Sequence, residues 1–329
     1  MDWLLDADTT AHKIALMVLA VVLFAAVMTA ILFSVDRPKR VPTWVVAAGF
    51  VGPTLLLLTL GLVYPAFRTL YQSFKDGSGD AFVGAANYTT IFTNDALLVV
   101  LRNTVAWVVL VPLVATTFGL VYAYLVDRTR FETLAKSLIF LPMAISGVAA
   151  GIIWRFVYEY RPDQQGIEQI GFANQLLVWL GLDPYQFLLT RPANTLFLIV
   201  VMIWINAGFA MTVLSAAIKA IPDDITEAAR LDGVSGVGMF RYVTVPSIRP
   251  ALVVVLTTVA ISTLKVFDVV FVMTGGQFGT SVLSNEFYSQ SFRQFNQGLG
   301  SALAVVLFVI VVPIIVYNVR QLRLSEEIR

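Results

Sequence analysis

The chain has 329 residues, of which 58% are hydrophobic and only 13% are charged. Its mean hydropathy of +0.81 lies far above the range of soluble proteins. The formal net charge of +1 gives no reason to expect a nucleic-acid partner. With no cysteine and one histidine, His12, which we interpret as a residue of the membrane interface, the sequence excludes disulfides and a thiolate or multi-histidine metal site.

Long apolar runs predict transmembrane helices, because a helix needs about 20 apolar residues to cross the hydrocarbon core of a bilayer. We expect about seven helices, near residues 14–35, 44–70, 104–126, 138–158, 195–218, 251–273 and 301–319. The first follows an acidic start, Asp2 to Asp8, where a secretory signal would be basic, and its apolar run is too long for a signal. The sequence therefore predicts an all-α polytopic membrane protein that keeps its first helix.

Two long connections, residues 74–101 and 160–192, carry Gly, Pro, Asn and Asp among apolar positions. We expect them to form a folded rim on which an external protein docks, since they are too short to be an independent binding domain. Within the span 138–158, the run Gly147-Val-Ala-Ala-Gly151 permits close helix contact, and internal packing is its expected use.

The basic residues predict the orientation of the chain in the membrane. If the amino terminus is outside, the inner segments are 36–43, 127–136, 219–250 and 320–329, and these hold 13 of the 22 Lys and Arg residues. Because basic residues favour the cytoplasmic side, segment 219–250 and the carboxy terminus are expected in the cytoplasm.

The polar segment 220–250 between two spans has the pattern of two short helices joined by glycine. Asp223 or Asp224 is expected to cap the first helix, Gly233 to end it in the left-handed conformation, and Ser235 to cap the second. A helix–Gly–helix of this size cannot bury its apolar faces alone. We therefore expect it to dock on another protein.

This segment resembles the EAA loop of the permease subunits of ATP-binding-cassette importers. The matching positions are Glu227, Ala228, Ala229, Asp232, Gly233, Phe240 and Pro246. Val234 replaces the usual Ala of the family pattern, and Val243 and Val245 replace Ile and Leu. In that family the loop is the coupling helix that sits in a groove of the ATPase subunit, so the resemblance implies that these residues couple the chain to an ATPase.

Shorter motifs extend the resemblance from about Val45 to the end of the chain. Stretches similar to permeases for sugars and related solutes are Tyr64-Pro65, Tyr71-Gln-Ser-Phe74, Val83-Gly-Ala-Ala-Asn-Tyr88 and Arg102-Asn-Thr104. The run from Lys265 to Gly276 is similar to maltose-transporter-type permeases. Its continuation Gln277-Phe-Gly-Thr280, with the run from Trp154 to Pro162, looks most like the permeases of α-glucoside uptake systems.

The resemblance implies a division of the chain at residue 43. Residues 1–43 would hold an outer start, an extra transmembrane helix and a cytoplasmic linker, and residues 44–329 a six-helix type I importer core in the prokaryotic cytoplasmic membrane. The implied partners are a second related permease, two cytoplasmic ATPase subunits and an extracytoplasmic solute-binding protein, besides membrane lipid. The implied cargo is an oligosaccharide such as an α-glucoside of the maltose, trehalose or sucrose class.

The chain itself is not expected to be an enzyme or to hold a cofactor or metal. It contains no G-x-x-x-x-G-K-[ST] phosphate-binding loop, so ATP and magnesium would be bound by the ATPase subunits. No catalytic residue is assigned.

Polar and aromatic side chains inside the spans are the candidates for the substrate path, because polar groups are costly there and face a cavity or a partner helix. The candidates are Trp204, Asn206, Thr263, Phe267, Asp268 and Phe271. Lys265 and Asp268 lie three apart, on one face of a continuous helix, where they can pair. Hydrogen bonding between helices is an equally good use of any one of these residues.

Two other classes of protein remain as alternatives. An ion-coupled secondary transporter is disfavoured because no inverted halves are detectable and carboxylates inside the spans are scarce. A membrane-embedded enzyme is disfavoured because no catalytic cluster is evident. Co-purification of an ATPase would support the importer, and ion-dependent uptake without ATP would support the secondary transporter.

Overall fold

The computed structural model describes residues 10–35, 43–127, 129–162 and 169–327, and all of the regular elements in these ranges are helical. In these ranges β pairing is limited to an isolated bridge between Lys75 and Phe82. The all-α expectation is therefore confirmed. The chain divides into two compact units, Met1–Arg68 and Thr69–Arg329.

The first unit is a pair of apolar helices. Helix α1 (Thr10–Val35) packs against α2 (Thr43–Leu58), which a π-helical turn, η2 (Thr59–Val63), joins to α3 (Tyr64–Gln72). Both helices are apolar on all sides, and large side chains such as Phe24 and Leu57 are exposed. A helix that is apolar all round is stable in lipid rather than in water.

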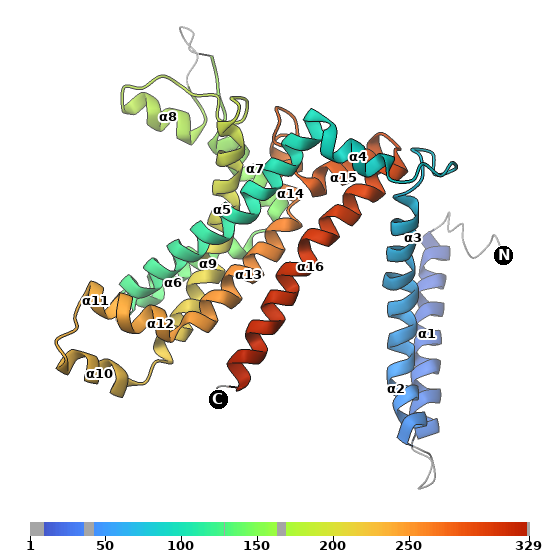
Figure 1. The fold of residues 1–329 in the computed structure, drawn as a ribbon, viewed down its shortest axis with the longest axis horizontal. Helices are drawn as coiled ribbons and strands as arrows, with labels where there is room; N and C mark the ends of the chain where they lie inside the picture. Colours follow the sequence, from blue (N-terminus) through green and yellow to red (C-terminus); the bar gives the residue numbers. More distant parts are fainter. Residues whose placement is uncertain (1–9, 36–42, 128, 163–168, 328–329) are drawn as a thin grey trace. The chain divides into compact units, whose positions relative to one another are not determined.

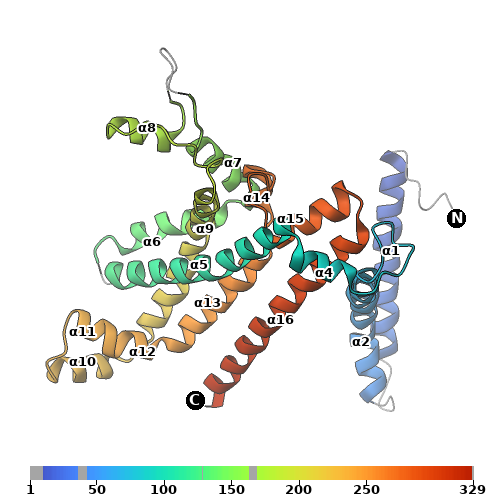
Figure 2. The ribbon, with the colours of Figure 1, turned by 45° about the horizontal axis from the view of Figure 1, so that its top comes forward.

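Four long helices form the body of the second unit: α5 (Asp95–Val126), α9 (Ala193–Lys219), α13 (Arg249–Leu264) and α16 (Gln297–Glu327). Helix α5 runs beside α9 and α13, and α13 runs beside α16 (Figure 1 and Figure 2). The contact between α5 and α9 is close at Gly119, where an added Cβ would lie 2.7 Å from the Cβ of Ala210. Trp107, Leu198 and Val255 are fully buried at the centre of this core.

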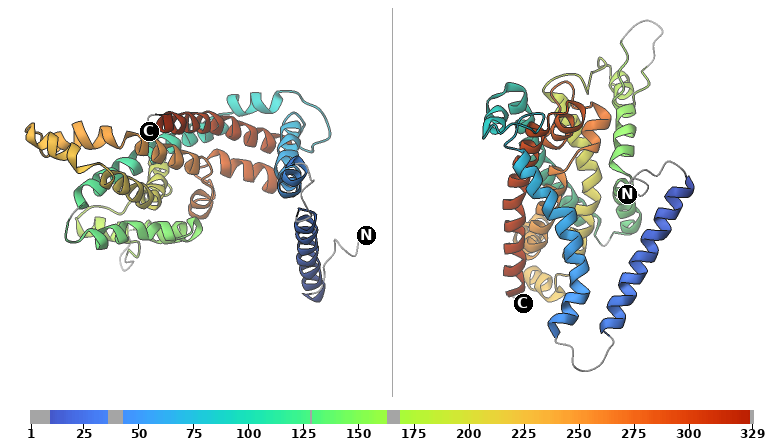
Figure 3. Two further views of the ribbon diagram at one scale, coloured as in Figure 1. Left: turned by 90° about the horizontal axis from the view of Figure 1, so that it is seen from below. Right: turned by 90° about the vertical axis from the view of Figure 1, so that its right-hand side faces the viewer.

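Short elements cover the two ends of this bundle. At one end lie α4 (Ala86–Thr93), α8 (Phe172–Trp179), α15 (Leu283–Tyr288) and η5 (Ser289–Arg293). At the other end the chain from α10 (Asp223–Leu231) through α11 (Val237–Met239), η4 (Phe240–Thr244) and α12 (Val245–Ser247) extends beyond the long helices (Figure 3). The predicted rim segments 74–101 and 160–192 contribute α4 and α8, at the end opposite to α10.

The predicted single span 138–158 is wrong in shape. The structure places there the end of α6 (Glu132–Phe140), a 3₁₀ turn, η3 (Leu141–Ala144), and α7 (Gly147–Val157). The two halves meet at an angle of 104°. Ser146 causes the restart, because its hydroxyl accepts a hydrogen bond from the backbone N–H of Ala149 and caps α7.

The predicted single span 251–273 is also divided. Helix α13 ends at Leu264, and three residues separate it from α14 (Asp268–Met273). The backbone N–H groups of Lys265 and Val266 bond to Ser262 and Thr263, three residues back, so the helix tightens and ends there. Periodicity alone could not predict this break, because the sequence around it contains neither Gly nor Pro.

Length and composition of the described helices agree with a multi-pass protein. Four of them, Ala47–Gln72, Asp95–Val126, Ala193–Lys219 and Gln297–Arg320, are long and apolar enough to cross a membrane. Two bent pairs, 132–157 and 237–264, raise this number to six if each crosses once, and Lys13–Thr29 is a shorter apolar stretch. The predicted ranges therefore fall on apolar helices, although two of them are not single straight helices.

Candidate coupling segment and solute pathway

The polar segment 223–247, which we call the coupling segment, has the predicted helix–Gly–helix form. Gly233 follows α10 with φ +82°, as predicted for the end of the first helix. Gly236 also has a positive φ, +53°, and precedes α11, a second special position that the sequence analysis did not identify. The backbone thus makes two left-handed turns between the short helices, which only glycine adopts without strain.

The predicted caps of the coupling segment are wrong. Pro222 stands at the N-cap of α10, and Asp223 and Asp224 lie in its first turn, where their charges favour the positive end of the helix dipole. Gly236, not Ser235, stands at the N-cap of α11. A proline before the helix explains the first error, because its extended backbone fixes where the helix starts.

The coupling segment exposes large apolar side chains. Leu231 is 90% exposed, Val237 81% and Tyr242 70%. Of the predicted coupling residues, Glu227, Ala228, Asp232, Gly233 and Pro246 are also exposed, while Ala229 and Phe240 are half-buried. Large apolar side chains that are exposed together are typical of surfaces that bind another protein.

Phe240 connects the coupling segment to the long helix α5. Its ring packs edge to face on Tyr124, with centroids 4.8 Å apart. The hydroxyl of Tyr124 donates a hydrogen bond to the backbone oxygen of Gly236 at 3.2 Å. Tyr124 carries no distinctive signal in the sequence, because a tyrosine near the end of a span is typical of any membrane helix.

A charged cluster joins α6 to the end of α9 from which the coupling segment leaves. Glu132 Oε1 pairs with the Nζ atoms of both Lys136 and Lys219, each at 2.5 Å. Lys136 also donates a hydrogen bond to the hydroxyl of Ser215. The cluster ties the start of the bent pair to α9.

An aromatic groove of about 420 Å³ lies between α5, α9 and the bent pair α6–α7. Its rings come from Phe118, Tyr122, Trp154 and Trp204, and the two indoles meet edge to face at 5.6 Å. The remaining lining residues are Leu138, Ile139, Pro142, Val200, Ile203 and Ala207. Flat apolar faces of this kind suit the C–H surface of a sugar ring.

The predicted path residues do not gather in one place. Trp204 lines the aromatic groove, but Asn206 does not, and its side-chain amide donates to Met202 O at 2.8 Å within the same helix. Thr263 is buried and donates to Val259 O, also within its own helix. These two bonds are helix-internal uses of a polar side chain.

Phe267 and Phe271 stack on each other at 4.9 Å, and both rings pack against Tyr288. Lys265 and Asp268 do not lie on one continuous helix, because the chain breaks between α13 and α14. They form no ion pair in the described part of the chain. The predicted shared helical face is therefore wrong.

Asp268 lies instead against the start of α7. A Cβ added at Gly147 would lie 2.9 Å from Asp268 Oδ2, and one at Gly151 would lie 3.2 Å from Val272 Cβ. The two glycines thus form a groove for α14, so the expected internal use of this Gly-x-x-x-Gly run is confirmed. The contact holds the two broken spans together.

Comparison with known proteins identifies the family. Residues 115–323 match the family described as the inner membrane component of binding-protein-dependent transport systems. The chain is 47% identical to the osmoprotective compounds uptake permease protein GgtC of Synechocystis sp., over 85% of this chain and 100% of that protein. It is 43% identical to the alpha-glucoside transport system permease protein AglF of Rhizobium meliloti, over 82% of this chain and 80% of that protein.

The fold is also known from crystal structures. A chain of a bacterial alginate ABC transporter, in complex with an alginate pentasaccharide-bound periplasmic protein, superposes with a TM-score of 0.71. The match covers 84% of this chain and 92% of that chain at 21% identity. Together with the coupling segment and the apolar helices, these matches show that the chain is a multi-pass membrane protein that belongs to the family of binding-protein-dependent transport system inner membrane components.

Proposed function

We propose that the chain is one permease of an ATP-driven importer for a neutral oligosaccharide of the α-glucoside class. The coupling segment carries this proposal, because its positions match the EAA pattern and its tip exposes Leu231, Val237 and Tyr242. The identities to AglF and GgtC support a small glucoside or a related osmoprotective solute as cargo.

The proposed complex contains a second, related permease, two cytoplasmic ATPase subunits and an extracytoplasmic solute-binding protein. The ATPase subunits would bind ATP and magnesium, so that this chain transmits the work of hydrolysis without performing it. The amino terminus would lie outside, and the coupling segment and carboxy terminus in the cytoplasm, as the basic residues indicate.

The coupling segment is placed to move the walls of the aromatic groove. It continues directly from α9, which carries Trp204, and leads directly into α13. Through Tyr124 it also holds α5, which carries Phe118 and Tyr122. A shift of the segment against the ATPase would therefore displace α5 and α9 and change the access to the groove, as alternating access requires.

The proposal is tested by transport into proteoliposomes that contain this chain with its partner subunits. Uptake of ¹⁴C-labelled maltose, trehalose or sucrose should require ATP in the vesicle lumen, which takes the place of the cytoplasm. It should also require the binding protein in the solution outside the vesicles. Uptake that persists without ATP and stops when an ionophore collapses the ion gradients would instead establish the secondary transporter. Uptake of none of these sugars would exclude the proposed cargo class.

A further inference from the structure

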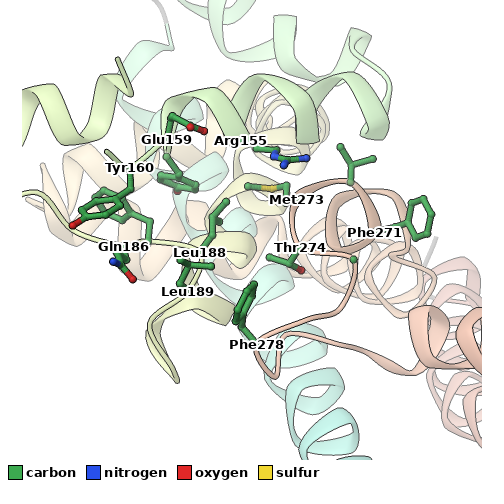
Figure 4. Close-up of a pocket in the computed structure, with 14 residues that line it drawn as sticks. Arg155, Glu159, Tyr160, Gln186, Leu188, Leu189, Phe271, Met273, Thr274 and Phe278 are labelled. Carbon is green, nitrogen blue, oxygen red and sulfur yellow. The ribbon is translucent and has the colours of Figure 1, made fainter. Parts of the chain in front are cut away.

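A second cavity, of about 460 Å³, lies between the ends of α7 and α14 and the segment 186–189 (Figure 4). Segment 186–189 precedes α9, whereas the coupling segment follows it. Because α9 has 27 residues, the cavity lies about 40 Å along the helix from the coupling segment. Its volume falls within the range of roughly 300–1,000 Å³ that is usual for small-molecule sites.

The polar side chains that line this outer cavity include those of Arg155, Glu159, Tyr160 and Gln186. None of them makes a side-chain hydrogen bond or ion pair to any residue that the structure describes. They therefore offer a guanidinium donor, carboxylate acceptors, and a phenol and an amide that both donate and accept. The opposite charges of Arg155 and Glu159 cancel formally, which suits a neutral ligand with several hydroxyl groups better than an ion.

An aromatic and aliphatic wall faces these polar groups. Figure 4 shows Tyr160 and Gln186 on one side of the cavity, and Phe278 and Thr274 on another. Phe278 is 44% exposed although it is a large apolar residue. The combination of a few hydrogen-bonding groups with an exposed ring matches the two surfaces of a sugar, its hydroxyl groups and its C–H face.

Phe278 is held in an unfavourable backbone conformation. Its φ is +57°, and among the described residues only Phe295 shares a positive φ without being glycine. The side-chain amide of Asn194 donates to Phe278 O at 2.9 Å, and that of Asn103 donates to Gly279 O at 2.7 Å. A left-handed phenylalanine costs free energy and persists only where its surroundings fix it, which is common at ligand sites.

We propose that this cavity is an outer binding site for a neutral carbohydrate. The carbohydrate would bind here first and then pass to the aromatic groove. Arg155, Glu159, Tyr160 and Gln186 would bond the hydroxyl groups, and the ring of Phe278 would cover a sugar face. The inference rests on the proposed function, because a sugar importer receives its cargo at the face opposite to the ATPase.

Cysteine protection tests the site directly, because the natural chain contains no cysteine. Leu189→Cys places a thiol in the cavity wall, and Leu182→Cys places one in the same outer segment but outside the cavity. The labelling rate of each thiol by N-ethylmaleimide would be measured by mass spectrometry of this chain, in the assembled complex in nanodiscs. Maltose, trehalose and sucrose would be the probes, without the binding protein.

At least one of these sugars should slow the labelling of Leu189→Cys severalfold and leave Leu182→Cys unchanged. Adding Gln186→Leu should weaken this protection, raising the half-protecting sugar concentration about tenfold, as expected for one lost hydrogen bond. Gln277→Leu, an exposed amide beside Phe278 that does not line the cavity, should leave the protection unchanged.

Absence of protection by every sugar, in a preparation whose Leu189→Cys complex still imports sugar with ATP, would overturn the site and leave the proposed function intact. Protection by the sugar-free binding protein alone would also overturn it, because the cavity would then be a protein contact. A wild-type complex that imports none of the sugars would refute the proposed function, whatever the labelling shows.

Discussion

Tyr124 of α5 and Phe240 of the coupling segment pack edge to face, with ring centroids 4.8 Å apart and ring planes at 61°. Tyr124 makes a second contact nearby, from its hydroxyl to Gly236 O. Both contacts join the coupling segment to α5, a helix that lies far from it in the sequence. Tyr124 is therefore placed to transmit movement of the coupling segment to α5.

Replacing Tyr124 should uncouple hydrolysis from transport. Tyr124→Ala removes an aromatic pair worth about 0.5–1.5 kcal/mol, so we expect fewer sugars transported per ATP hydrolysed. Tyr124→Phe keeps the ring and loses only the hydroxyl bond, and should stay close to wild type. The ratio of uptake to ATP hydrolysis in proteoliposomes measures both. Equal ratios in Tyr124→Ala and wild type would contradict the transmission role.

Gly233→Val should impair the coupling segment. A β-branched residue at φ +82° costs about 1–3 kcal/mol of backbone strain, so we expect reduced assembly with the ATPase or reduced transport-coupled hydrolysis. Gly181→Val is the matched control, because Gly181 has φ +75° and, like Gly233, open space around an added Cβ. If both variants assemble and hydrolyse ATP equally well, the turn at Gly233 has no special part in coupling.

Trp204→Leu should reduce uptake more than Asn206→Leu does. Trp204 lines the aromatic groove, whereas one N–H of Asn206 is already bonded to Met202 O. Loss of the indole ring, on which a sugar could stack, should weaken uptake by the equivalent of about 1 kcal/mol or more, while basal ATP hydrolysis stays unchanged. Initial rates of labelled sugar uptake decide the order. A larger effect at Asn206 would move the solute contacts away from the groove.

The turn at residues 76–81 should depend on pH through Asp76. Partial desolvation raises the pKa of this carboxyl, but hydrogen bonds from Ser78 and from the N–H groups of Asp80, Ala81 and Gly79 together lower it more, so the pKa lies below its ordinary value of 3.8. Because the pKa of Asp76 is lower in the folded chain, its carboxylate stabilises the turn above pH 3.8. This stabilisation is lost as the pH falls through the pKa of Asp76 in the folded state.

Hydrogen exchange of the Gly79 and Asp80 amides should therefore stay slow at pH 5 and accelerate below pH 3.8 relative to intrinsic rates. Asp76→Asn should exchange faster at pH 5, while Asp80→Asn, whose side chain accepts no hydrogen bond from the described residues, should not. Protection factors of these amides, measured relative to intrinsic rates, that do not change as the pH falls from 5 through the folded pKa of Asp76 would contradict the role of the carboxylate.

Much of the fold is readable from the sequence because lipid imposes long apolar helices. The limits of α9, 193–219, lie within two residues of the predicted 195–218. Helix α5 begins at Asp95 rather than 104, because Asn94 caps it in the polar segment before the apolar run. An apolar run predicts the part of a helix that lies in lipid. It does not predict where the helix begins in the polar segment before that run.

The site was less predictable, because it depends on contacts between distant segments. The turn at Gly233 is predictable from its neighbours in sequence, because they end the first short helix there. Tyr124, Glu132 and Phe278 gain their importance only from partners on other elements, and no spacing in the sequence indicates those partners. The end of α13 at Leu264 also has no signal in the sequence, because no Gly or Pro marks the point where its backbone hydrogen bonds change.

The coupling role is tested most directly by identifying the protein that the tip of the coupling segment contacts. Leu231→Cys, at a position 90% exposed, would be labelled with maleimide-benzophenone and photo-crosslinked in membrane vesicles, with Leu182→Cys as the control. We predict labelling of Leu231→Cys only in inside-out vesicles, and a crosslink to an ATPase subunit that Leu182→Cys does not form. Labelling from the outer side, or a crosslink to the solute-binding protein instead, would contradict the coupling role and the orientation together.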